Sequence, residues 1–256
     1  MLKLSKYEFR KNRNALLLLI AGLIFLQILY LLALNTKDDD YIFSAAGTLF
    51  LYALICYFSI FIFAVTNYYR EINSRTSYLI FMTPVSPLRI VLSKMLTVLF
   101  LGIILAALLG VLGVWDIHLL ASNYEEYTGM LDMINELLLE FGIKTDEIFS
   151  SILFTLLTFL LSFYSTIAVI YLCITLTATL LQNSRFKVIV SIVFFLLASE
   201  GRSKLEELIG NHYVIRYGER FLDLLFQAWP YTLLNLGVLL LSVTATTWLL
   251  KKKLSL

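Results

Sequence analysis

Six long apolar runs divide this chain, and the charged residues between them alternate in sign from one gap to the next. A transmembrane helix needs about 20 apolar residues to cross hydrocarbon about 30 Å thick. The runs, of which all but the fifth meet that length, are Leu16–Leu34, Ile42–Val65, Met95–Val114, Ile148–Leu181, Phe186–Ser199 and Tyr231–Leu250. A soluble domain has little room to bury so many, so the pattern predicts an all-α polytopic membrane protein with six transmembrane helices.

The composition agrees with this fold class and excludes others. The chain is 60% hydrophobic with a mean hydropathy of +0.85, well above an ordinary soluble domain. The net charge of +2 sums two layers of opposite sign, and no basic tract beyond the membrane flanks suggests nucleic acid. Cys56 and Cys173 lie inside apolar runs, where we expect them to be small apolar fillers. Without repeats or linkers, the sequence predicts one transmembrane domain over residues 1–256.

The alternating charges predict the orientation of the spans. Alternate gaps hold fourteen of the 20 Lys and Arg residues, with only Glu8 and Glu71 of the 18 acids. Basic residues near span ends are retained in the cytoplasm during insertion. We therefore expect both termini to be cytoplasmic, with outer insertions over residues 115–147 and 200–229. The fifth run is short enough for a re-entrant segment, but only a crossing keeps Lys251–Lys253 on the basic side.

The first thirteen residues are too polar to enter the bilayer. Apolar residues alternate there with five basic ones: Lys3, Lys6, Arg10, Lys11 and Arg13. This pattern predicts a short interfacial helix whose basic side chains lie among lipid phosphates. A plain charged anchor for the first span is the alternative.

The sequence lacks the residues that several kinds of function require. No glycine precedes a lysine, so the chain has no phosphate-binding loop for ATP, and its two histidines form no metal or acid–base motif. No carboxylate or lysine falls in the middle of a predicted span, which disfavours an ion-coupled transporter, and no nucleophile–base pair suggests an intramembrane enzyme. The spans are instead rich in hydroxyls, which serve packing or line a neutral path. Candidates for such a path are Ser59, Thr66, Asn67 and Ser191.

The gap between the second and third runs holds the most informative pattern. Residues 74–82 are amphipathic at helical spacing, and Pro84 and Pro87 end that segment before the third span. A short helix held parallel to the membrane by two spans makes a lever that a partner can push. A capped connecting loop is the alternative.

This gap resembles the loop of ABC-2 type permeases, the membrane subunits of ATP-binding-cassette exporters. The family pattern is a Glu, a Gly-Thr, an apolar helix, Thr-Pro-Val-Ser and a Lys at the next span. This chain matches it with Glu71, Thr76, Leu79–Met82, Thr83-Pro84-Val85-Ser86 and Lys94. It departs at the glycine, which is Arg75 here. The interfacial N-terminal segment, the six spans and the insertion between the last two also resemble the family.

The resemblance implies half of an ATP-driven exporter in a bacterial plasma membrane. Two copies of the permease, most simply a homodimer, would each dock on one of two cytoplasmic ABC ATPase subunits, which would use ATP and Mg. This chain would itself bind no cofactor and hydrolyse no ATP. The coupling residues would be Arg70, Glu71, Arg75, Thr76, Leu79, Phe81, Thr83, Pro84 and Ser86. Neutral, aromatic-rich spans favour amphipathic or apolar cargo, including antimicrobial or cytolytic peptides. An ion-coupled secondary permease and a non-transporting scaffold or sensor subunit are the alternatives.

Overall fold

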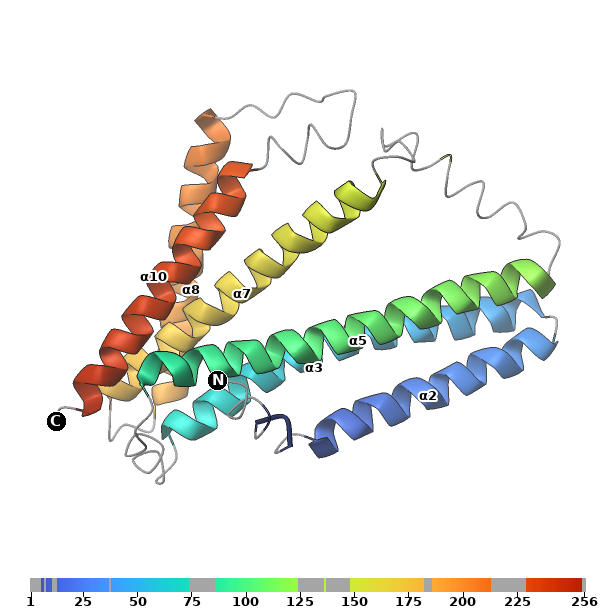
Figure 1. Ribbon diagram of the computed structural model, residues 1–256, viewed down its shortest axis with the longest axis horizontal. Helices are drawn as coiled ribbons and strands as arrows, with labels where there is room; N and C mark the ends of the chain where they lie inside the picture. Colours follow the sequence, from blue (N-terminus) through green and yellow to red (C-terminus); the bar gives the residue numbers. More distant parts are fainter. Residues whose placement is uncertain are drawn as a thin grey trace. The chain divides into compact units, whose positions relative to one another are not determined.

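The computed structural model describes residues 6, 8–10, 13–36, 38–73, 86–123, 136, 148–181, 186–212 and 229–254. Within these ranges nearly every residue is helical and none lies in a strand, which confirms the predicted all-α class. The long helices, shown in Figure 1, are α2 (Arg13–Thr36), α3 (Asp39–Asn73), α5 (Pro87–Asn123), α7 (Ile148–Leu180), α8 (Lys187–His212) and α10 (Trp229–Leu254).

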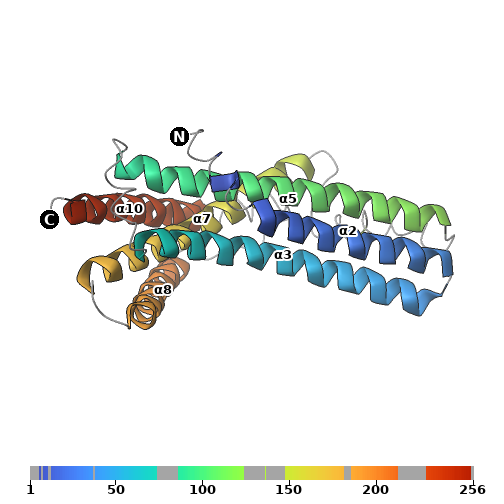
Figure 2. The same cartoon turned by 90° about the horizontal axis from the view of Figure 1, so that it is seen from below.

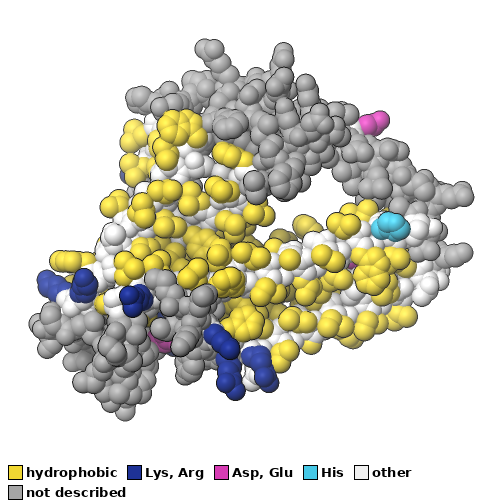
Figure 3. Space-filling model, in the orientation of Figure 1, with side chains coloured by type: hydrophobic (Ala, Val, Ile, Leu, Met, Phe, Trp, Pro, Cys, Tyr) yellow, Lys and Arg dark blue, Asp and Glu magenta, His cyan; other side chains and the backbone are white. Residues whose placement is uncertain are grey.

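Five of these helices are long and apolar enough to cross a membrane. The candidate spans lie in α2, α3, α5, α7 and α10. Helix α8 is not among them, because charged residues interrupt its second half: Glu200, Arg202, Lys204, Glu206 and Glu207. Hydrophobic side chains cover much of the described surface on the face drawn in Figure 3, as a lipid-facing surface requires. The structure thus supports a multi-pass membrane protein, whereas the sixth crossing stays a prediction.

Three helices extend beyond the apolar runs that predicted them. Helix α3 continues to Asn73, α5 runs from Pro87 to Asn123, and α8 continues to His212. Residues 115–123 and 200–212 therefore continue α5 and α8 into the predicted outer insertions. The rest of the predicted insertions lies outside the described residues, apart from Glu136, which is helical.

Local capping explains where two of these helices begin. Asp38 precedes α3, and its side-chain Oδ1 accepts a hydrogen bond of 3.2 Å from the Asp40 backbone N–H, as an N-cap residue does. Pro87 is the first residue of α5, where a missing N–H removes no helical bond. The Ser86 carbonyl oxygen accepts from the Ile90 N–H at 3.3 Å and so starts the helical ladder.

The chain divides into two compact units, of which the first comprises residues 1–64 and 92–132. In it α2 lies beside α3 and α5, as Figures 1 and 2 both show. Tyr30, Leu34 and Ile42 form a buried cluster against which Leu119 and Leu120 of α5 pack. Tyr52 of α3 donates a hydrogen bond of 2.9 Å to the Leu19 carbonyl oxygen. A side chain at Gly22 would collide with the end of the Tyr52 ring, so the glycine leaves room for that ring against α2.

The second unit comprises residues 65–91 and 133–256, and it centres on α7. Helix α7 contacts both α8 and α10, most extensively α10. Small or hydroxyl-bearing residues are buried along α7 and α10, and the hydroxyls of Thr175, Thr177 and Thr246 donate to carbonyl oxygens one turn earlier in their own helices. Hydroxyls satisfied in this way can pack as apolar groups.

Candidate functional site

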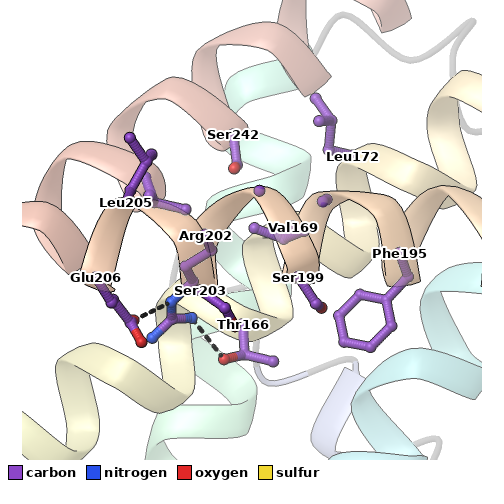
Figure 4. Close-up of a pocket in the computed structure, with 13 residues that line it drawn as sticks. Thr166, Val169, Leu172, Phe195, Ser199, Arg202, Ser203, Leu205, Glu206 and Ser242 are labelled. Atoms are coloured by element: carbon purple, nitrogen blue, oxygen red, sulfur yellow. Dashed lines mark hydrogen bonds and ion pairs between the residues drawn. The ribbon is translucent and has the colours of Figure 1, made fainter. Parts of the chain in front are cut away.

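A cavity of about 690 Å³ lies within the second unit, between α7, α8 and α10. Its walls are mainly apolar, with Val169, Leu172, Phe195, Leu205 and Val238 among them. Figure 4 shows the side chains of Arg202 and Glu206 beside this apolar lining, together with several hydroxyl groups. Ligand sites typically have volumes of about 300–1,000 Å³ and combine apolar walls with a few polar groups. This cavity has that character.

Arg202 joins all three helices around the cavity. Its Nε donates to Glu206 Oε1 at 2.9 Å, one turn along α8. Its Nη1 donates to Thr166 Oγ1 at 3.2 Å, and its Nη2 donates to Ser162 Oγ at 3.3 Å, both on α7. Nη2 also donates to Asn235 Oδ1 of α10 at 2.6 Å. One charged group therefore holds the register of α7, α8 and α10.

The Arg202 guanidinium lies far from the basic ends of α8 and α10. Along α8, the step from Lys187 to Arg202 corresponds to about 22 Å, and along α10 the step from Lys251 to Asn235 corresponds to about 24 Å. Glu206, one turn further along α8, has a side chain that is 37% exposed, so the ion pair lies toward the end of α8 that is opposite Lys187.

The last turns of α3 are anchored on α7 by Tyr68. The Tyr68 ring stacks on the Tyr171 ring, with centroids 3.9 Å apart and planes inclined by 11°. The Tyr68 hydroxyl shares a hydrogen bond of 2.7 Å with Thr175 Oγ1, and the Tyr68 side chain is almost completely buried. The chain segment just before the predicted coupling loop is therefore held on a helix that also lines the cavity.

In the first unit, Lys94 forms a buried ion pair that the sequence did not reveal. Lys94 Nζ of α5 donates to Glu8 Oε1 at 3.0 Å, and the two side chains are only 6% and 9% exposed. Glu8 belongs to the segment predicted to lie at the membrane surface. Within that segment Lys6 and residues 8–10 are helical, and Arg13 begins α2. The interfacial helix as a whole stays a prediction, because Lys3 and Lys11 lie outside the described residues.

A second polar pair links α2 to the C-terminal part of α5. Gln27 Nε2 of α2 donates a hydrogen bond to Asp116 Oδ1 of α5. Both residues lie within candidate membrane spans, because α5 continues beyond the run that ended at Val114. Gln27 is buried, and its Oε1 finds no hydrogen-bond partner in the described part of the chain. The sequence placed Asp116 in an outer segment because only the apolar run, and not the helix, defined that span.

The predicted coupling residues fall only partly within the described structure. Arg70 and Glu71 lie in the last turn of α3, exposed and half-buried respectively, and Ser86 is exposed just before α5. The remaining six lie outside the described residues: Arg75, Thr76, Leu79, Phe81, Thr83 and Pro84. Their role as a docking surface stays a prediction.

The structure does not place the predicted path residues around the cavity. Ser59 instead lines a smaller pocket of about 250 Å³ in the first unit, among Leu16, Ile60 and Phe63. In the second unit Thr66 is exposed, Asn67 is half-buried and Ser191 is buried, and none of the three lines the cavity. The polar groups that do gather there are those around Arg202.

The sequence contained signals for this site that the span prediction missed. Arg202 and Glu206 are spaced by four residues, which places them on one face if the helix continues past Ser199. Ser162 and Thr166 have the same spacing on α7, and so share a face. The predicted end of the fifth span at Ser199 hid the first relation, because Arg202 was assigned to an outer insertion.

Comparison of the chain with protein-family models, curated proteins and solved structures finds no match. A function for the cavity therefore has to be argued from its own residues and from the resemblance in the loop.

Proposed function

We propose that this chain is the membrane permease subunit of an ATP-driven exporter of the ABC-2 type. In this proposal it moves amphipathic or apolar cargo out of a bacterial cell. The observation that carries the proposal is the cavity between α7, α8 and α10, whose apolar walls and few polar groups suit such cargo. The Thr83-Pro84-Val85-Ser86 resemblance supplies the exporter class.

The anchoring of α3 supports a route for coupling. ATP binding to the partner would move the loop between α3 and α5, and α3 would carry that motion as a rigid helix. Because Tyr68 is stacked on Tyr171, displacement of the end of α3 would act on α7. Helix α7 lines the cavity, so ATPase closure could change the cavity's shape.

Docking of the ATPase tests the proposal directly. Loss of a buried interfacial aromatic commonly costs about 2 kcal/mol or more, so Phe81→Ala should weaken ATPase binding roughly thirtyfold. Arg75→Ala, which removes a rim charge, should cost less than about 1 kcal/mol. The measurement is ATPase affinity for the permease in nanodiscs. Phe58→Ala is the matched control, since Phe58 is exposed on α3 in a candidate span.

Two outcomes would contradict the coupling assignment. If Phe81→Ala and Arg75→Ala bind the ATPase and transport as the wild type does, the loop is a connector only. If the purified chain alone hydrolyses ATP after trace contaminants are removed, the division between permease and ATPase subunit is wrong.

The Asp116–Gln27 pair favours an ion-coupled permease as the second candidate. A carboxyl group within a candidate span is the kind of residue that binds a proton or cation in such transporters. Transport into inside-out vesicles distinguishes the two mechanisms. Under the exporter proposal, transport with ATP persists when ionophores are present, and Asp116→Asn leaves it intact. Loss of transport on adding ionophore at constant ATP would instead support ion coupling.

A further inference from the structure

We propose that the cavity between α7, α8 and α10 binds an amphipathic anion whose acidic head takes the place of Glu206 on the Arg202 guanidinium. This inference rests on the proposed export function and specifies its cargo class as a molecule with one acidic head and an apolar tail. Three features support it: the apolar walls, the single cation among the described lining residues, and the weakness of that cation's present ion pair.

The lining provides a place for each part of such a molecule. The wall residues Val169, Leu172, Phe195 and Val238 offer apolar surface to a tail. Among the described residues that line the cavity, Arg202 is the one basic residue. A guanidinium is always charged and recognises carboxylate and phosphate oxygens with several N–H donors. The cavity therefore combines an apolar chamber with one anion-binding group.

The partners of Arg202 differ in how easily an incoming anion could replace them. Ser162, Thr166 and Asn235 are neutral acceptors fixed on other helices, and they orient the guanidinium without neutralising it. Glu206 alone supplies the opposite charge. Its side chain is 37% exposed, against 20% for Arg202, so solvent can reach it.

The pairing between Arg202 and Glu206 is also of a weak type. Exposed pairs four residues apart on a helix contribute only about 0.3–0.5 kcal/mol. An acidic head that brought its own tail into the cavity would add contacts with the apolar walls that Glu206 cannot make. The displaced Glu206 carboxylate would turn to solvent at the rim of the cavity. The net charge of the guanidinium site is unchanged by this exchange.

Photolabelling of the purified chain can test the exchange without any ATPase present. The probes are a dodecanoic acid that carries a diazirine on its tail and the corresponding dodecanol, each added to the protein in phosphatidylcholine nanodiscs. Both probes place the same tail in the bilayer, so the difference between them isolates the acidic head. We expect saturable labelling of α7, α8 or α10 cavity residues by the acid, and at least tenfold weaker labelling by the alcohol.

Two variants should move binding of the acid in opposite directions. Arg202→Gln should weaken it about tenfold, because the charged donor is lost. Glu206→Gln should strengthen it about twofold, because the competing carboxylate is gone. Arg202→Lys, which keeps the charge, should bind more tightly than Arg202→Gln. Lys204→Gln is the matched control, since it removes the same charge from an exposed position on α8 outside the cavity lining, and it should bind as the wild type does.

Several results would overturn the inference. Equal labelling by acid and alcohol would remove the role of the acidic head. Weaker binding in Glu206→Gln would show that the ion pair maintains the cavity rather than competing for it. A loss in Lys204→Gln as large as in Arg202→Gln would show general attraction of anions to α8. If the acid binds as expected but no ATP-dependent export is found, the exporter proposal fails and the binding site stands. If export occurs but the acid does not bind, the anionic cargo class fails alone.

Discussion

Two ion pairs of nearly equal length lie in the two units of this molecule, and they differ in almost everything except length. Lys94 and Glu8 are 3.0 Å apart, and Arg202 and Glu206 are 2.9 Å apart. The first pair joins segments that are 86 positions apart in the sequence and is sealed from solvent. The second joins adjacent turns of one helix and borders a cavity.

The difference shows why the length of an ion pair says little about its role. A sealed pair has lost the hydration of both charges, so removing one partner leaves the other charge buried and unpaired. A pair at the edge of a cavity can exchange its partner for water or a ligand at low cost. By this argument Lys94–Glu8 maintains the first unit, whereas Arg202–Glu206 is suited to exchange.

The largest expected effect is on the sealed pair. Lys94→Met should lower the free energy of unfolding by about 3–5 kcal/mol, because the buried Glu8 carboxylate loses its ion pair with Lys94. The measurement is denaturant titration of the purified protein in detergent. The matched control is Lys251→Met, which removes an exposed lysine and should change the stability by less than about 0.5 kcal/mol.

A double variant sharpens this prediction. Glu8→Gln combined with Lys94→Met leaves no buried charge, so it should recover a substantial part of the stability that Lys94→Met loses. If Lys94→Met alone is as stable as the Lys251→Met control, the pair does not maintain the first unit, and the comparison between the two pairs fails.

The second prediction concerns the packing of the Tyr52 side chain of α3 against Gly22 of α2. Gly22→Ala places a methyl group where the Tyr52 ring lies, and should lower the free energy of unfolding by about 1–3 kcal/mol through overpacking and loss of the Tyr52–Leu19 hydrogen bond. Gly47→Ala is the matched control in α3, because a methyl group there meets nothing within 4 Å. It should be neutral or stabilising by up to about 1 kcal/mol. Equal effects of the two substitutions would contradict the packing of Tyr52 against Gly22.

The sequence predicted a helix with nearly correct ends wherever the apolar run was about as long as the helix. The run Leu16–Leu34 became α2 over Arg13–Thr36, and the run Ile148–Leu181 became α7 over Ile148–Leu180. The predicted helix ends were wrong where a helix continues beyond its apolar run. Hydropathy detects the preference for lipid, whereas the backbone ladder continues through polar residues when their side chains find partners, as Glu206 does with Arg202.

There is a further reason why the candidate site could not be predicted from the sequence. Arg202 forms a site because its guanidinium donates hydrogen bonds to Ser162, Thr166 and Asn235, which lie on two other helices. Their meeting depends on the relative register and rotation of α7, α8 and α10, and hydrophobic periodicity constrains neither in helices that are apolar on most sides. The same limitation hid the Gln27–Asp116 and Lys94–Glu8 pairs.

The third prediction tests the anchoring of α3 on α7. Tyr68→Phe keeps the stacking on Tyr171 and removes the hydroxyl that bonds Thr175. Thr175 retains its bond to the Tyr171 carbonyl oxygen, so the loss should be about 1 kcal/mol in the free energy of unfolding. Tyr69→Phe removes a hydroxyl from the next residue and should change the stability less. A null result for Tyr68→Phe would assign the anchoring to the ring stack alone.

The smallest expected effect is on the pair beside the cavity. Glu206→Gln should change the free energy of unfolding by less than about 0.5 kcal/mol, since the carboxylate is solvent-accessible and the pair links adjacent turns of one helix. Arg202 keeps its three neutral partners on α7 and α10, so the register of the helices should persist. The measurement is the same denaturant titration that is used for Lys94→Met. A loss of 2 kcal/mol or more would place this pair in the same structural class as Lys94–Glu8, and Glu206 could then no longer be the residue that leaves Arg202 when a ligand arrives.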